Sequence, residues 1–184
     1  GGFRGVVLTD IIQFVLLLFS ALVVFVVAFS KSGGWAAIAQ SAEVHNKTQY
    51  MSIGAGASKY FTYVITFGCA WTIQANVWQR LSATRSETDA RKMTVMSFFA
   101  YIPLYLIVVF TGMAALVLFD TVPKGGLVTA IVMNYMPPVL GAFVFVGISA
   151  AIMSTMDSLI NTGAMTLTLD LFPQLGDETK MLSR

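Results

Sequence analysis

Long apolar segments alternate with shorter polar segments along the chain. Four apolar segments, at residues 5–29, 57–78, 93–119 and 139–169, are long enough to cross a bilayer as helices. None of them shows the strict alternation of apolar and polar residues over short stretches that is typical of membrane β-strands. The pattern therefore predicts an all-α membrane protein with four transmembrane helices.

The composition also indicates a membrane protein. Hydrophobic residues make up 57% of the chain and charged residues only 11%, whereas about a quarter of the residues of soluble domains are charged. The formal net charge of +2 is too small to indicate nucleic-acid binding. We expect a multi-pass protein of the bacterial inner membrane, which contacts the lipid bilayer and binds no nucleic acid.

The connecting segments differ in their basic residues. Because cytoplasmic loops carry an excess of Lys and Arg near helix ends, the bias predicts a cytoplasmic loop at residues 79–92 and outer loops at residues 30–56 and 120–138. Within the last loop, residues 127–136 are expected to form a short helix that Pro137 ends. Seven of the 11 basic residues lie on the predicted cytoplasmic side: Arg4, Arg80, Arg85, Arg91, Lys92, Lys180 and Arg184.

The fourth apolar segment contains a cluster of polar residues. Ser154, Thr155, Asp157 and Ser158 are costly to place in hydrocarbon unless they face a polar partner. On a helix, six small or polar residues share one face, and Asp157 lies at its edge. The six are Ala151, Ser154, Thr155, Ser158, Asn161 and Thr162. Close helix packing would explain the hydroxyls alone, but an intramembrane carboxylate favours ion or proton handling. A small hard cation, which prefers oxygen ligands, is a suitable partner.

A second carboxylate lies near the start of the first apolar segment. Asp10 would be favoured there by the helix dipole alone, within reach of water at the membrane surface. The predicted topology, however, places the first and fourth helices antiparallel, so that Asp10, Asp157 and Ser158 share the inner half of the membrane. Two carboxylates with several hydroxyls would bind a cation or share a proton.

Three motifs in the right order resemble the sodium:solute symporter family. The opening of the chain resembles the start of the family's fifth core helix, a later pair of motifs resembles the end of the sixth with its basic loop, and a third resembles the sodium motif of the eighth. These are GGFRGVVLTDIIQ (1–13), WTIQ (71–74) with WQRLSA (78–83), and AIMST (151–155). The resemblance implies an inverted-repeat fold of five plus five helices. We expect residues 1–184 to be one partial transmembrane domain that further helices of a longer chain complete.

The resemblance also implies two sodium sites. Ala151 would offer its backbone carbonyl, and Ser154 and Thr155 their hydroxyls, to the sodium site that members share. Asp10 and Ser158, with Asp157, would match a second sodium site found in some members. The family often has a hydroxyl where Asp157 stands, so protons are an alternative coupling ion.

The same comparison implies where solute would bind. Phe67 and Ala70 stand where sugar-transporting members have polar and tyrosine contacts, and Tyr101 stands where they have a lysine. These differences argue for a carboxylate or an amino-acid-like solute rather than a sugar. Trp71 and Gln74 are further candidates to line the solute site, although ordinary packing explains Trp71 equally well.

The function that follows is sodium-coupled symport of a small organic solute by alternating access. A sensor module of a signalling protein, built on the same fold, is the main alternative. A structural membrane subunit is another. A membrane enzyme is not expected, because the single histidine, His45, and the single cysteine, Cys69, are far apart and form no nucleophile–base or metal-ligand pattern.

Overall fold

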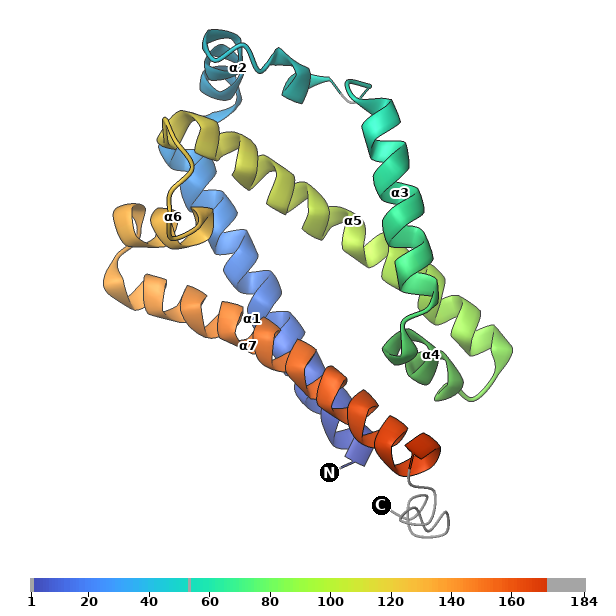
Figure 1. Ribbon diagram of the computed structural model, residues 1–184. Coiled ribbons are helices and arrows are strands. Elements are labelled where there is room, and N and C mark those ends of the chain that lie inside the picture. Colours follow the sequence, from blue (N-terminus) through green and yellow to red (C-terminus); the bar gives the residue numbers. More distant parts are fainter. Residues whose placement is uncertain (1, 53, 172–184) are drawn as a thin grey trace.

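The computed structural model describes residues 2–52 and 54–171, and these residues form helices joined by short connections (Figure 1). The all-helical class is thus confirmed for the described part of the chain. Lys180 and Arg184, which contribute to the charge bias, lie outside it. The elements are α1 (Gly2–Lys31), α2 (Gly34–Val44), η1 (Thr48–Met51), α3 (Ala57–Thr72), α4 (Ala75–Ser82), α5 (Glu87–Leu118), α6 (Leu127–Tyr135), α7 (Pro138–Met165) and η2 (Thr166–Leu171).

Three of the described helices are long and apolar enough to cross a membrane. They are the segments Val7–Lys31, Glu87–Leu118 and Pro138–Thr168, in the places of the first, third and fourth predicted spans. The last of them runs from α7 into the π-helical turns of η2. A crossing helix needs roughly 20 residues, and each of these segments satisfies that length.

The predicted second span is not one continuous helix. α3 ends at Thr72, after 16 residues, and α4 begins at Ala75. Between them Gln74 adopts an extended conformation, with ψ of 119°. Trp78 spans the break, because its indole Nε1 donates a hydrogen bond to the carbonyl of Thr72 at 2.6 Å. The prediction of a single helix over residues 57–78 is therefore wrong, and a crossing by α3 and α4 together stays a prediction.

The predicted cytoplasmic loop is shorter than expected. α4 extends to Ser82, and α5 begins at Glu87 rather than near residue 93. The early start of α5 has a local cause: the Ser86 hydroxyl accepts a hydrogen bond from the backbone N–H of Asp89 at 3.1 Å. This is a helix N-cap, and the acidic side chains of the first turn also favour a helix start.

The segments expected as outer loops contain short helices. α6 confirms the helix expected over residues 127–136, and Pro137 follows it in an extended conformation. α2 was not predicted. It begins after a reversal at Gly33 and Gly34, both of which have positive φ, and it buries Ile38 and Ala42. Residues with a side chain rarely adopt a backbone conformation with positive φ, so the reversal favours glycine at both positions.

The hydrophobic core lies at the end of the bundle that carries α2 and α6. Its buried residues come from the second half of α1, from α2, from the end of α5, from α6 and from the start of α7. At the opposite end, near the N-terminus and α4, α5 lies away from α1 and α7, which stay side by side (Figure 1). α3 makes no extensive contact with another described helix. The helices are tightly packed at one end of the bundle, and the open arrangement at the other end leaves room for polar groups.

α1 and α7 form the most extensive helix pair, and they run antiparallel. Ser20 in the middle of α1 faces Gly147 of α7, and Asp10 near the start of α1 faces Ser154 in the second half of α7. Glycine allows this approach, because a Cβ at position 147 would lie 1.9 Å from the Ser20 Oγ. The predicted antiparallel arrangement therefore brings Asp10 to the polar part of α7.

Candidate ion site

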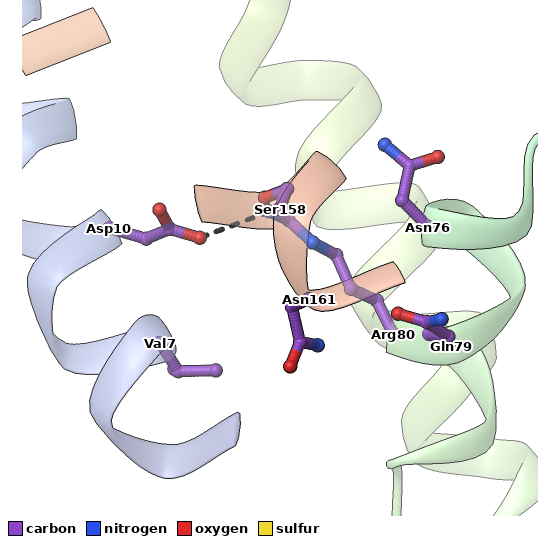
Figure 2. Close-up of a pocket in the computed structure, with 7 residues that line it drawn as sticks. All are labelled: Val7, Asp10, Asn76, Gln79, Arg80, Ser158 and Asn161. Carbon is purple, nitrogen blue, oxygen red and sulfur yellow. Dashed lines mark hydrogen bonds and ion pairs between the residues drawn. The ribbon is translucent and has the colours of Figure 1, made fainter. Parts of the chain in front are cut away.

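A cavity at the open end of the bundle collects polar side chains from three helices. α1, α4 and α7 all contribute to it, as Figure 2 shows. The residues that line it are Val7, Asp10, Asn76, Gln79, Arg80, Ser158 and Asn161. Six of these seven side chains are polar, which is unusual next to helices as apolar as α1 and α7.

Asp10 is the centre of the polar contacts. Its side chain is 18% exposed. One carboxylate oxygen, Oδ1, accepts a hydrogen bond from the Ser154 hydroxyl at 2.5 Å, and the other, Oδ2, accepts one from Nη2 of Arg80 at 3.0 Å. Both oxygens are therefore engaged, one by α7 and one by α4.

Residues on one face of α7 continue this network. Ser158, one turn after Ser154, accepts a hydrogen bond from the same Nη2 of Arg80 at 3.0 Å. Thr162, a further turn along, donates to Oε1 of Gln79 at 3.2 Å and to its own helix at the Ser158 carbonyl. Residues spaced by four share a helix face, so the hydroxyl face predicted from the sequence is turned toward α1 and α4.

Ala151 and Thr155 lie on a neighbouring face of α7. The Thr155 hydroxyl donates a hydrogen bond to the Ala151 carbonyl at 3.1 Å. The Thr155 side chain is exposed, and Ala151 is half-buried. The structure thus pairs two of the three residues expected in the shared sodium site, whereas Ser154 is turned toward Asp10.

Asp157 does not join the cluster. Its side chain is half-buried, and its carboxylate forms no hydrogen bond or ion pair with the described residues. It does not line the cavity. Within residues 2–52 and 54–171, no three His, Cys, Asp or Glu side chains come together as metal ligands would. The structure therefore brings one carboxylate, Asp10, together with Ser154 and Ser158, and the expected second carboxylate stands apart.

The residues expected to line a solute site are not gathered by the described helices. None of them lines the cavity. Phe67 on α3 stacks on its neighbour Tyr63, and Tyr101 on α5 packs against Tyr105, each within its own helix. Except for Ala70, which is half-buried, all of them are exposed: Phe67, Trp71, Gln74 and Tyr101.

Three residues of α4 that line the site were not identified as site residues from the sequence. Asn76, Gln79 and Arg80 share one face of α4, at the spacing i, i+3 and i+4. From the sequence, Arg80 is a charge that sets topology and part of the WQRLSA motif, not a site residue. The amphipathic spacing after WTIQ is the signal that could have revealed this face. Asn161, one turn after Asp157, lies on the polar face of α7 that the sequence predicts, and it lines the cavity.

Gln13 offers a further oxygen one turn from Asp10 on α1. Its side-chain Oε1 is buried and accepts no hydrogen bond from the described residues. Buried acceptors without a partner are rare in folded proteins and call for an explanation such as a bound water or ion. Gln13 does not line the cavity, so this oxygen is a second polar group on α1, three residues from Asp10 along the helix.

Comparison with known proteins identifies one family. The model of the sodium:solute symporter family matches residues 1–181. No curated protein and no solved structure gives a significant match.

Proposed function

The chain belongs to the sodium:solute symporter family, and on that premise we propose that it forms the ion-binding part of a symporter for a small carboxylate or amino-acid-like solute. Members of this family are transporters rather than enzymes, and they couple solute transport to sodium. The three long apolar helices and the family together make the chain part of an integral membrane protein. The membrane we expect is the bacterial inner membrane.

The observation that carries the proposal is the contact between Asp10 and Ser154. A carboxylate in an apolar helix is costly unless charged or polar groups compensate it. Here an antiparallel partner helix supplies two hydroxyls, at Ser154 and Ser158, next to that carboxylate. Carboxylate and hydroxyl oxygens are ligands that a hard cation prefers. The cluster is therefore suited to a sodium ion.

We assign the shared sodium site to Ala151, Ser154 and Thr155. The Ala151 carbonyl and the Thr155 hydroxyl already lie 3.1 Å apart. Thr155 is exposed to the space outside the described helices, where further helices of the full-length chain would complete the coordination. Ser154 lies between this pair and Asp10, so an ion at either place would compete for the same hydroxyl.

We assign the second site to Asp10 and Ser158. Asp157 would join it only after a change of side-chain or helix position, because its carboxylate contacts neither residue in the structure. Because Asp157 stands where the family often has a hydroxyl, protons remain an alternative coupling ion. In either case, each unit charge that crosses a potential of 100 mV supplies about 2.3 kcal/mol for uptake.

The solute class follows from the residues of α3 and α5. Phe67, Ala70 and Tyr101 replace the polar contacts of sugar-transporting members, which supports a carboxylate or amino-acid-like compound. Trp71 and Gln74 would contribute to the same site. α3 makes no extensive contact with another described helix, so its apolar surface is free to face solute, lipid or further helices.

Uptake by the full-length protein tests this proposal. Proteoliposomes would be assayed with a panel of labelled carboxylates, amino acids and sugars, with an inward sodium gradient and with choline in its place. We expect sodium-driven accumulation of at least one carboxylate or amino acid, and none of a sugar. Sodium-driven accumulation of a sugar alone would refute the solute assignment. Binding of solute without any accumulation would favour the sensor alternative.

A further inference from the structure

Arg80 occupies the position in which a cation would neutralise Asp10. Its Nη2 lies 3.0 Å from Oδ2 of Asp10 and 3.0 Å from Oγ of Ser158. In Figure 2 the side chain reaches from α4 across the cavity to these two groups on α1 and α7. A free cation that used the same carboxylate and hydroxyl oxygens could not be accommodated while the guanidinium is there, because both would need the same lone pairs and would repel each other.

The Arg80 side chain is able to leave this position. It is 51% exposed, whereas Asp10 is 18% exposed. A long basic side chain can move its charged head into water at small cost, while its methylene groups stay on the protein. The carboxylate on α1 has no such freedom. Of the two partners, Arg80 is therefore the one that can move away from the other.

α4 is held to the rest of the bundle by polar contacts. It buries none of its residues. Within the described part of the chain, its hydrogen bonds to α1 and α7 are the two that Arg80 donates to Asp10 and Ser158 and the one that Gln79 accepts from Thr162. α3, which precedes α4, makes no extensive contact either. Release of Arg80 would thus remove most of what attaches α4 to α1 and α7.

We propose that Arg80 is a tethered cation that fills the Asp10–Ser158 site when no ion is bound, and that an entering sodium ion displaces it and releases α4 from α1 and α7. The choice of sodium rests on the proposed function. The exchange links the occupancy of an ion site to the position of a helix. It makes Arg80 a gating residue of that site rather than a ligand.

An ion pair with a purely structural role would behave differently. Partly exposed pairs contribute little stability, and they do not respond to the identity of the monovalent cation at constant ionic strength. Displacement by sodium requires that sodium and choline, at equal concentration, have different effects on α4. This difference separates the two roles.

Hydrogen exchange in the full-length protein measures the release of α4. Backbone exchange of residues 75–82 would be followed in sodium chloride and in choline chloride at equal ionic strength. We expect sodium to make these amides exchange faster, although a bound ligand usually slows exchange. Asp10→Asn should abolish the sodium effect. Arg80→Gln should give fast exchange in both salts, because α4 then lacks its ion pair with Asp10 in either salt.

Sodium affinity gives a second readout. If the Arg80–Asp10 ion pair is formed in about 90% of molecules without sodium, the apparent dissociation constant of sodium is raised about tenfold. Arg80→Gln should therefore lower that constant by roughly this factor. Arg85→Gln is the matched control: it removes a positive charge from the connection that follows α4, and Arg85 is exposed without a hydrogen bond or ion pair to the described residues. It should change neither readout.

The outcomes separate this inference from the proposed function. Sodium-driven uptake together with exchange of residues 75–82 that is equal in both salts, or slower in sodium, would overturn the tethered-cation role and leave the symport proposal standing. Faster exchange of α4 in sodium without sodium-driven uptake would support the tethered cation and refute symport. An unchanged sodium affinity in Arg80→Gln would also overturn the inference.

Discussion

A single methyl group added at Gly147 is expected to destabilise the protein strongly, because α1 and α7 lie close together there. A Cβ at Gly147 would lie 1.9 Å from Oγ and 2.7 Å from Cβ of Ser20, and 2.8 Å from the carbonyl oxygen of Leu16. Ser20 is 2% exposed and has no room to move aside. Gly147→Ala therefore forces the helices apart.

The size of this effect follows from the contact with the backbone. Ordinary contact begins at 3.4 Å, so α1 and α7 must separate locally by about 0.6 Å to accommodate the Leu16 carbonyl alone. Overpacking of this kind costs about 1–3 kcal/mol. Because position 147 lies roughly 10 Å along α7 from Ser154, the separation should also weaken the contact of Ser154 with Asp10.

Unfolding of the full-length protein, followed with denaturant in detergent, would measure the loss. Gly163→Ala is the matched control on α7, since no atom lies within 4 Å of the added Cβ. Ser20→Gly should partly rescue Gly147→Ala, because it removes the two shortest contacts but not the carbonyl contact. The reasoning fails if Gly147→Ala is as stable as Gly163→Ala, or if the two substitutions at positions 20 and 147 are additive.

Three further predictions concern the site and the helix ends. Ser86→Ala removes the N-cap of α5 and should destabilise its first turn by about 1 kcal/mol, seen as faster amide exchange after residue 86 and contradicted by unchanged exchange. Asp10→Asn removes the charge that binds the ion and should raise the sodium concentration for half-maximal uptake about tenfold or more. Asp120→Asn, in an exposed connection, should leave that concentration unchanged. Equal behaviour of the two variants would count against the second site. Trp78→Phe removes the hydrogen bond across the break between α3 and α4 and should increase exchange at residues 73–76; no increase would show that the break is held by other contacts.

The sequence predicted the long helices because their length and hydrophobicity are local properties. The break at Gln74 was missed for the same reason. The residues on both sides of it are apolar enough to count as one segment, and the extended conformation of Gln74 depends on the chain around it. α2 was missed because eleven residues of mixed polarity give little periodic signal; it is stabilised by burial of Ile38 and Ala42.

The candidate site was only partly predictable. Helical periodicity and antiparallel topology were enough to bring Asp10, Ser154 and Ser158 together. They were not enough to place Asp157, because a residue at the edge of a face can turn either way with a small rotation of the helix. Arg80 was missed because its contacts depend on the reach of a long side chain across the space between α4 and α1, which sequence spacing does not show.

The most direct test of the account is the sodium dependence of uptake in hydroxyl variants of α7. Ser154→Ala and Thr155→Ala would be compared in the full-length protein with Thr94→Ala. Like that of Thr155, the Thr94 hydroxyl donates to a carbonyl one turn earlier in its own helix, that of Ala90, but at an exposed position of α5. We expect both α7 variants to lose most sodium-driven uptake and sodium affinity, and Thr94→Ala to retain both. Unchanged sodium affinity in Ser154→Ala and Thr155→Ala would contradict the assignment of the ion site.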